Sequence, residues 1–526
     1  MGPFKQWSAT VRGVCYNVSV QIRGTDVRVT VMRLAAALAA LLLGASVGVP
    51  TALGRIPGPV SCATSVPVLV VGGTPAGVAA AVAAARMGMP VLMTEARPYL
   101  GGDLTGSMLN MFDMDYGPGG QQLSRGVFSE VFRQLGITFD VELAKHVFLR
   151  EVRREPLVTL RLSTRPVQVF VKSQRIVGVV VEDEVNHERE AICAKRIVDA
   201  TDDADVAAMA GVPYSLGREG SGVDHAMMAA TLVFELDGVH WREVLEYVTN
   251  TSGRLATRGG TYHGNAWGYG DIMRRYRPIE PGIGIYDLNI GRQNNRTVLI
   301  NGLLVYGVDG TDPASVADGM SRARAELPRL IEYLRSFAPG FRDAELVRPA
   351  DYLYIRETRH IRGLATLTVQ DIVDARVFWD AVGVASYPID LHPYRPGELN
   401  PYAAHRYVYT IPLRALVPIG ITNLLVASRS ISASYEAAGS ARVIPTTMEE
   451  GQAAGAAAVL SIRAKVMISR FTEAPALVHE LQGTLYEQGQ YLLPETMAAA
   501  AGNTVHQLPG TSPISIKPQA QAPSPP

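Results

Sequence analysis

The sequence has few cysteines. Only Cys15, Cys62 and Cys193 occur among its 526 residues, and none stands in a CxxC pair or a cluster. An iron–sulfur cluster needs four thiolates, and a redox-active disulfide needs a closely spaced pair. The sequence therefore excludes electron transfer through clusters or thiols. It predicts three unrelated thiols, with Cys193 buried in a strand.

The sequence also has no excess of charge of either sign, because Lys+Arg and Asp+Glu both number 49. There is no basic run interleaved with aromatic residues of the kind that follows a phosphate backbone. Nucleic acid is therefore not an expected partner. The motifs HExxH and GxSxG are absent too, so the sequence supports neither a metallohydrolase nor a serine hydrolase, and no metal site is expected.

Both ends of the chain differ in composition from its middle. In "VMRLAAALAALLLGASVGVPTALG", Arg33 precedes an apolar run that ends in small residues at 52–54. This pattern predicts a secretory signal, with translation starting at Met1 or Met32 and a mature chain beginning near Arg55. The alternatives are an uncleaved membrane anchor and a cytoplasmic protein. The Pro-, Ser- and Gln-rich segment "QLPGTSPISIKPQAQAPSPP" predicts disorder at the other end.

A glycine loop opens the folded part. Residues 66–71 predict a buried parallel strand and residues 76–87 an alanine-rich helix, joined by "GGTPAG". Gly72 permits a sharp turn, Gly77 lets the helix approach the strand, and the helix N-terminus directs N–H groups at a pyrophosphate. Thr74 stands where the fingerprint has its middle glycine. The loop predicts a dinucleotide site, and the alternative is a structural βαβ unit with a glycine turn.

Glu95 supports the dinucleotide. It ends a second predicted strand 23 residues after Gly72, where an acidic residue binds the adenosine ribose and disfavours a 2′-phosphate. Gly101 and Gly102 follow in "LGGD", where the backbone can approach a ligand closely.

Several later segments bear on which dinucleotide is bound. "AKRIVDATDDADVAAMAGVPYSLGRE" (194–219) resembles the second FAD segment of glutathione-reductase-like flavoproteins, with Asp202 in place of a glycine. "NLLVASRSISASYEAAGSARVIPTTMEEGQAAGAAAVLSI" (423–462) resembles their closing segment, with a helix predicted to begin at Gly451. Together with 353–363, 386–394 and 407–420, the chain resembles the bacterial FAD-dependent oxidoreductase family, which is related to the FAD domain of the heterodisulfide reductases.

The resemblance covers residues 65 to about 470 and implies noncovalent FAD. The cluster-binding cysteines of the heterodisulfide reductases are missing, so no iron–sulfur cluster is implied, and neither is a tightly bound NADPH, because a second GxGxxG unit is missing. The expected cofactor contacts are Gly72, Gly73, Thr74, Pro75, Ala76, Gly77, Glu95, Ala96, Gly101, Gly102, Val167, Ala200, Thr201, Asp202, Arg429, Gly451, Ala454 and Gly455.

The expected fold is α/β, with a Rossmann-like FAD domain in two parts, 65–214 and 351–470. An inserted α+β substrate domain spans 215–350. An N-terminal segment, 1–64, precedes the folded part, and a tail, 471–526, follows it. Strands are expected at "TLVFELDGV" and "RTVLINGLLVYGVDGTD", and a helix at "SVADGMSRARAELPRLIEYLRSF". The substrate pocket is expected between the two domains.

Candidate chemistry rests on a few side chains. Arg356 and Arg359 are candidate cations beside the flavin or clamps for a substrate carboxylate, and the alternative is an ion pair with Glu357 or another acid. Arg442 has the same two interpretations. His392 is the candidate acid–base group, near Asp390 and Tyr435, and the alternative is a turn cap beside Pro393. His360 is expected to be structural.

The sequence thus predicts an oxidoreductase that transfers a hydride between a small organic substrate and FAD, with an unidentified electron acceptor as partner. Two alternatives remain at this stage: a flavin-binding protein without turnover, and an NAD-linked dehydrogenase. Membrane association is expected only through the N-terminal segment.

Overall fold

The computed structural model describes residues 20–22, 25–27, 61–249, 259–402 and 405–500. The chain divides into two compact units, Met1–Pro59 and Val60–Pro526. In the first unit, β1 (Val20–Ile22) pairs with β2 (Thr25–Val27). The predicted export segment lies outside the described residues. Among the helices of the described ranges, none is both long and apolar enough to span a bilayer.

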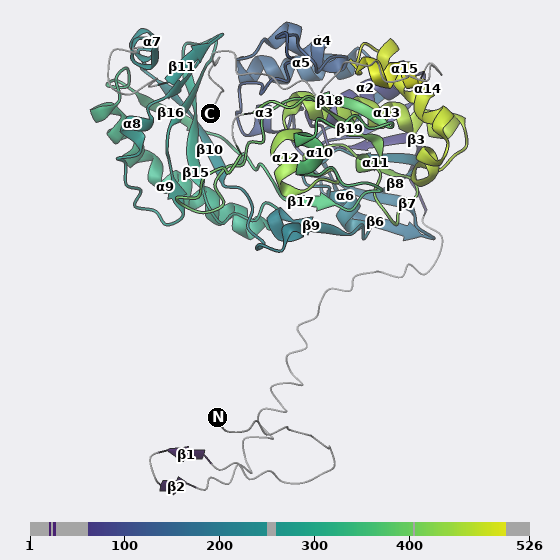
Figure 1. Ribbon diagram of the computed structural model, residues 1–526, viewed down its shortest axis with the longest axis horizontal. Helices are drawn as coiled ribbons and strands as arrows, with labels where there is room; N and C mark the ends of the chain where they lie inside the picture. The colour runs from purple at the N-terminus through teal and green to yellow at the C-terminus, as the bar shows by residue number, and fades with distance from the viewer. Residues whose placement is uncertain (1–19, 23–24, 28–60, 250–258, 403–404, 501–526) are drawn as a thin grey trace. The chain divides into compact units, whose positions relative to one another are not determined.

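One seven-stranded sheet of the second unit includes β3, β8, β7 and β6, which lie on the right in Figure 1. Its strand order is β5-β4-β3-β8-β7-β6, and β20 also pairs with β8. The strands β3, β4, β5, β8 and β20 run parallel, whereas β6, β7 and β8 form an antiparallel meander. The strands are β3 (Thr64–Val71), β4 (Val91–Thr94), β5 (Val158–Arg161), β6 (Thr164–Lys172), β7 (Arg175–Asp183), β8 (Arg189–Asp199) and β20 (Leu424–Val426). The strands predicted around the glycine loop are confirmed.

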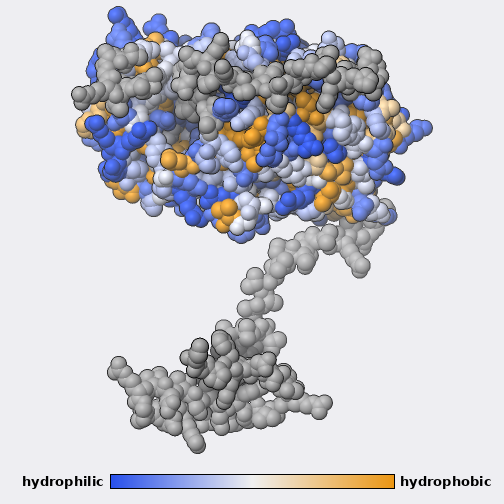
Figure 2. Space-filling model, in the orientation of Figure 1, coloured by the Kyte–Doolittle hydropathy of each residue, from blue (hydrophilic) through white to orange (hydrophobic). Residues whose placement is uncertain are grey.

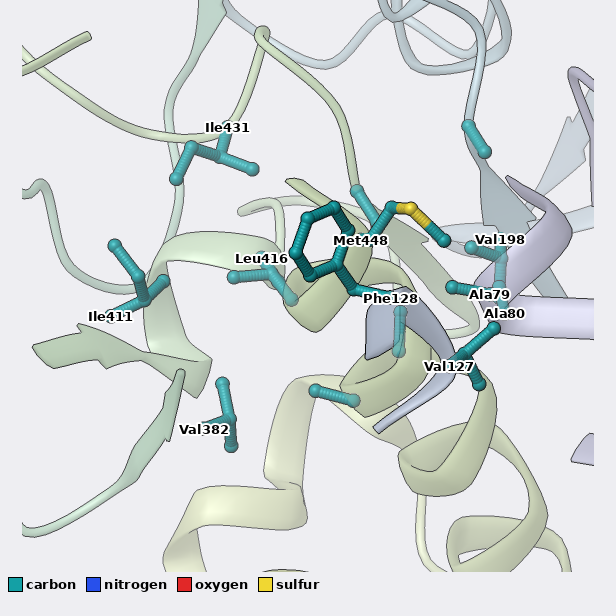
Figure 3. Packing of buried hydrophobic residues seen from close by; sticks show 14 of the residues in the cluster. Ala79, Ala80, Val127, Phe128, Val198, Val382, Ile411, Leu416, Ile431 and Met448 are labelled. Carbon is teal, nitrogen blue, oxygen red and sulfur yellow. The ribbon is translucent and has the colours of Figure 1, made fainter. Parts of the chain in front are cut away.

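Two helices rich in small residues pack against each other beside this sheet. They are α2 (Pro75–Arg86) and α13 (Ile444–Arg463). Gly451 and Gly455 of α13 face the backbone of α2, because a Cβ on either would collide with the carbonyl oxygen of Ala76 or Ala80. Figure 3 shows the adjoining core, where Phe128 of α4 (Val127–Leu135) lies beside α2 and α13. The parallel sheet with its buried helices agrees with the predicted α/β class.

A second seven-stranded sheet, entirely antiparallel, lies within residues 215–350. Its order is β11-β12-β14-β15-β10-β16, with β13 pairing to β15. The predicted helix at 315–337 is α9 (Pro313–Phe337), which buries Leu327, Leu330 and Leu334 in the core of this sheet. The strands are β10 (Ala230–Asp237), β11 (Gly259–Tyr262), β12 (Asn265–Gly268), β13 (Ile283–Gly284), β14 (Leu288–Arg292), β15 (Val298–Val305) and β16 (Glu345–Pro349).

Shorter elements connect and flank the two sheets. On the face shown in Figure 2, hydrophobic residues lie in small groups among hydrophilic ones. The two short antiparallel pairs are β9 (Tyr214–Leu216) with β17 (Arg359–Ile361), and β18 (Ala381–Ala385) with β19 (Tyr409–Pro412). The remaining helices are α3 (Asp103–Gly106), α5 (Val141–Arg153), α6 (Asp205–Met209), η1 (Gly217–Ser221), α7 (Trp241–Thr249), α8 (Gly270–Met273), α10 (Val369–Val373), α11 (Leu413–Leu416), α12 (Tyr435–Ala441), η2 (Ile468–Glu473), α14 (Pro475–Glu487) and α15 (Pro494–Ala500). The last 26 residues of the predicted tail lie outside the described ranges.

The structure corrects the prediction that the three cysteines are unrelated thiols. Cys62 and Cys193 form a disulfide with their Cα atoms 5.7 Å apart, so they are not unrelated thiols. Cys62 precedes β3 and Cys193 lies in β8, and the parallel register of these two strands places Ser65 opposite Cys193. The bond therefore joins the start of the folded unit to the middle of its sheet. A separation of 131 residues gave the sequence no spacing from which to recognise the pair.

Candidate functional site

The glycine loop turns sharply between β3 and α2. Gly72 has a φ of +107°, and a Cβ there would collide with the carbonyl of Ala200 at the end of β8. Gly77 is equally restricted, since its Cβ would collide with the carbonyl oxygen of Gly72. The loop therefore requires glycine at both positions that the sequence identified.

Thr74 has a definite role at the position of the missing middle glycine. It is the N-cap of α2, where its Oγ1 accepts a hydrogen bond from the Gly77 N–H at 3.2 Å. The same hydroxyl donates to the carbonyl oxygen of Ala200 at 2.9 Å. Thr74 thus caps the helix and also ties the loop to β8.

Glu95 lies beside this loop, as its place at the end of β4 predicts. Its buried carboxylate accepts hydrogen bonds from the backbone N–H groups of Gly73 and Arg97. The side chain is therefore held next to the N-terminus of α2. That it binds a ribose remains a prediction.

A cleft opens at the N-terminus of α2, and we call it the loop cleft. Its walls include Thr74, Pro75, Ala76, Asp103, Asp202, Arg356, Arg429, Arg442, Val443 and Ile444. The free space within it is only about 30 Å³.

Acidic residues of the loop cleft are balanced by Arg429. This arginine donates to Asp103 at 2.9 Å and to Asp203 at 2.7 Å, and it lies 3.9 Å from Asp202. Burial raises the pKa of Asp202 to about 7, although Arg429 opposes the shift. Asp202, which stands in place of a glycine, therefore opposes an anionic ligand less than a fully ionised carboxylate would.

The helix predicted to begin at Gly451 begins seven residues earlier, which corrects the prediction. α13 starts at Ile444, with Val443 as its N-cap and Pro445 in its first turn. Pro is favoured there because its fixed φ suits a helix and it lacks only an N–H that has no intrahelical partner. Gly451, Ala454 and Gly455 are buried in the body of the helix, and none of them lines the loop cleft. The end of α13 that faces the cleft is Val443 and Ile444.

Three arginines line the loop cleft, and each has an unsatisfied donor. The Nε atoms of Arg356, Arg429 and Arg442 are buried and have no hydrogen-bond partner among the described residues. A buried donor without a partner is costly, so a ligand that accepts from it is stabilised. Together with the N-termini of α2 and α13, these donors suit the phosphate and flavin oxygens of a dinucleotide.

A larger cavity, of about 380 Å³, adjoins the loop cleft. Its walls come from two parts of the chain. Asp287 and Asn301 belong to the region of the antiparallel sheet, and Asp390 and His392 belong to the segment after β18. The residues that line both spaces are Leu109, Met111, Asp113, Tyr354 and Arg356. The two spaces therefore meet at a junction that contains one carboxylate and one guanidinium.

An acid–base group lies at the large cavity. His392 Nε2 is 3.2 Å from Asp390 Oδ2, and the same carboxylate oxygen accepts from Arg442 at 2.9 Å. Burial lowers the pKa of His392 to about 4, and Arg356 adds to this effect. Burial opposes ionisation of Asp390, but His392, Arg442 and Arg356 hold its pKa below the ordinary value. At neutral pH the pair is therefore a neutral imidazole beside a carboxylate.

Asp113, which the sequence did not single out, lies at the junction. It accepts a hydrogen bond from the Tyr387 hydroxyl at 3.0 Å. Burial and the charge of Asp390 raise its pKa to about 6, against the opposing effect of Arg442. No sequence motif marks Asp113 within "NMFDMDYG". Only the fold brings it between the two spaces.

Other predicted residues line neither space. Arg359 pairs with Asp205 at 2.9 Å, as the ion-pair alternative expected. Tyr435 packs edge-on against Tyr394 instead of facing the large cavity with His392. His360 is buried against Glu357 at 3.0 Å, in a structural position. The remaining predicted contacts that line neither space are Gly72, Gly73, Gly77, Glu95, Ala96, Gly101, Gly102, Val167, Ala200 and Thr201.

Residues 67–485 match a protein family described as FAD dependent oxidoreductase. No curated protein matches the chain. A geranylgeranyl bacteriochlorophyll reductase-like protein from Thermoplasma acidophilum is 13% identical, with a TM-score of 0.40 and coverage of 81% of this chain and 84% of its own.

A p-nitrophenol 4-monooxygenase from Pseudomonas putida is 9% identical, with a TM-score of 0.41 and coverage of 84% and 93%. A flavoprotein/dehydrogenase from Cytophaga hutchinsonii is 14% identical, with a TM-score of 0.37 and coverage of 80% and 86%. These likenesses are too low to carry an argument about the reaction.

Proposed function

Because the chain belongs to the family of FAD-dependent oxidoreductases, we propose that it transfers a hydride between a small organic substrate in the large cavity and noncovalent FAD in the loop cleft. The observation that supports this most is the junction, where Asp113 and Arg356 line both spaces. A substrate and a flavin must come into direct contact for hydride transfer, so their sites must adjoin, as these two spaces do.

The residues of the loop cleft suit FAD. Thr74 and the N-terminus of α2 would hold the pyrophosphate, and Glu95 would bind the ribose. Arg356, Arg442 and the N-terminus of α13 would face the flavin end, where positive potential favours the reduced form. When bound, FAD supplies the acceptor or donor of the hydride.

His392 would move the proton. A neutral imidazole can accept a proton from a substrate hydroxyl, and the low pKa of His392 keeps it neutral at physiological pH. Asp390 orients the ring and stabilises the imidazolium that forms, while Arg442 holds Asp390 in place. The reaction also requires an electron acceptor to restore the cofactor, and we leave its identity open.

Anaerobic flavin reduction tests this function. Candidate substrates are mixed with the purified holoprotein, and loss of the flavin absorbance identifies one that transfers a hydride. With that substrate, His392→Gln should slow reduction by about 10²–10⁴-fold and leave the flavin spectrum unchanged. His225→Gln is the matched control, because His225 is exposed and lines neither space. An unchanged rate in His392→Gln would contradict the proposed role.

We also propose that the protein is exported. The disulfide Cys62–Cys193 supports this, since disulfides persist in oxidising compartments and are rare in the cytosol. Mass spectrometry of periplasmic or secreted material should find a chain that begins near Arg55. An intact N-terminus found only in the cytosol would contradict export.

A further inference from the structure

One wall of the large cavity has polar side chains without hydrogen bonds to the described part of the protein. Asn289 of β14 lies directly opposite Asn301 of β15 in the antiparallel register. Asp287 precedes β14, and Arg274 follows α8. All four line the large cavity, and within the described residues none of their side chains has a hydrogen bond or a close ion pair, although Asp287 and Arg274 attract each other. We call this set the amide wall.

The chemistry of the amide wall matches hydroxyl groups. Each asparagine amide offers both donors and acceptors, Asp287 offers acceptors and Arg274 offers donors. A hydroxyl also donates and accepts, so several hydroxyls on one molecule can satisfy such a mixed set. Two amides side by side on a sheet are spaced to reach neighbouring groups of one ligand.

The charges of the cavity argue against an ionic ligand. Asp287 and Arg274 have opposite charges and interact with each other. Of the other carboxylates, Asp390 pairs with Arg442 and Glu398 with Arg218, while Asp113 accepts a hydrogen bond from the Tyr387 hydroxyl. A carboxylate ligand would face these acids, and a cationic ligand would face Arg274 and Arg356. A neutral ligand avoids both penalties.

Apolar surface completes the cavity. Leu304, Leu391, Leu399 and the ring of Tyr286 line it together with the polar groups. A ring-shaped polyol presents hydroxyls at its edge and C–H groups on its faces, so it fits a cavity with both kinds of wall. The volume of about 380 Å³ lies within the range of small-molecule sites.

We propose that the large cavity binds a neutral polyhydroxylated molecule of the saccharide class through Asn289, Asn301 and Asp287. This inference rests on the proposed function, because it gives a class to the substrate that the proposal places in this cavity. The amide wall holds the sugar by its hydroxyls and the apolar residues contact its C–H faces.

Calorimetric titration of the holoprotein tests the ligand class. The neutral probes are glucose, galactose, mannose and cellobiose, and glucuronate and glucosamine are the anionic and cationic counterparts of glucose. At least one neutral probe should bind, and more tightly than either charged counterpart. Failure of all four neutral probes, or tighter binding of glucuronate or glucosamine than of any neutral probe, would overturn the inference.

Variants test the wall itself. Asn289→Ala and Asn301→Ala should each weaken binding of the neutral probe by about tenfold, the loss expected for buried hydrogen bonds. Asn294→Ala is the matched control, since Asn294 is exposed on the connection between the same two strands. FAD content reports whether each variant is folded. Unchanged affinity in both folded wall variants would contradict the assignment.

Binding and reduction separate the two proposals. A neutral saccharide that binds without reducing the flavin supports the ligand class and contradicts the proposed hydride transfer. A substrate of another class that reduces the flavin, while no saccharide binds, supports hydride transfer and overturns the ligand class.

Discussion

His392 Nε2 lies 3.2 Å from Asp390 Oδ2 at the wall of the large cavity, and that oxygen also accepts a hydrogen bond from Arg442. The carboxylate therefore connects an imidazole that lines the large cavity to a guanidinium that lines the loop cleft. Burial and Arg356 keep the imidazole neutral although Asp390 opposes this effect, and Asp390 holds the ring in position for a proton acceptor.

Asp390→Asn should destabilise the protein, because it leaves the buried charge of Arg442 without its acid. Removing one partner of a buried ion pair costs about 3–5 kcal/mol. Urea unfolding followed by fluorescence measures the change. Asp374→Asn is a control, since Asp374 lies at the end of α10, away from both spaces. Equal stability of Asp390→Asn and the parent would show that the pair contributes little.

Acid should destabilise the protein partly through His392. Burial lowers its pKa from 6.5 to about 4 in the folded state, so between these values the unfolded chain binds more protons. Stability is therefore lost as the pH falls from 6.5 to 4, by at most about 3 kcal/mol, since one pKa unit corresponds to about 1.4 kcal/mol. In His392→Gln, the unfolding free energy should depend less on pH in this window. An identical pH dependence would exclude the buried neutral imidazole.

Gly77→Ala should prevent retention of FAD. The new Cβ would collide with the carbonyl oxygen of Gly72 and push α2 away from the loop. The flavin content of the purified protein measures the effect. Gly483→Ala is the matched control, because Gly483 lies in helix α14 with open space around it. Full FAD occupancy in Gly77→Ala would mean that the loop does not bind the cofactor.

Cys193→Ser should lower stability by about 2–4 kcal/mol, the usual contribution of a native disulfide. A reducing agent should lower the stability of the parent by a similar amount and leave Cys193→Ser unaffected. The response of Cys193→Ser to the reducing agent serves as the control, because this variant cannot form the bond. If complete reduction left the stability of the parent protein unchanged, this would contradict a stabilising role of the bond.

The features that could be predicted from the sequence are those that local patterns of residues determine. The strand, glycine loop and helix at 66–87 follow from residues close together in the chain, and the structure confirms them. The start of α13 was missed because Gly451 was interpreted as the beginning of a helix. In the structure this glycine allows close contact with α2, whereas Pro445 was the local start signal.

Contacts between distant segments could not be predicted in this way. Asp113 reaches the junction because the segment after α3, with Leu109 and Met111, lines both spaces. Tyr435 was grouped with His392 as a candidate for acid–base chemistry, but in the structure it packs against Tyr394. Cys62 and Cys193 pair only because β3 and β8 are neighbours in the sheet.

We propose that the flavin meets the large cavity at Arg356. The reduction potential of the bound flavin tests this proposal most directly. Arg356→Gln removes a cation from the junction, so the reduced, anionic flavin should become less stable. We expect a dye-coupled titration to show a potential lower by about 30 mV or more, since 30 mV corresponds to about 1.4 kcal/mol for two electrons. Arg359→Gln, which removes an arginine paired with Asp205 away from both spaces, should leave the potential unchanged. A potential in Arg356→Gln equal to that of the parent would contradict the account.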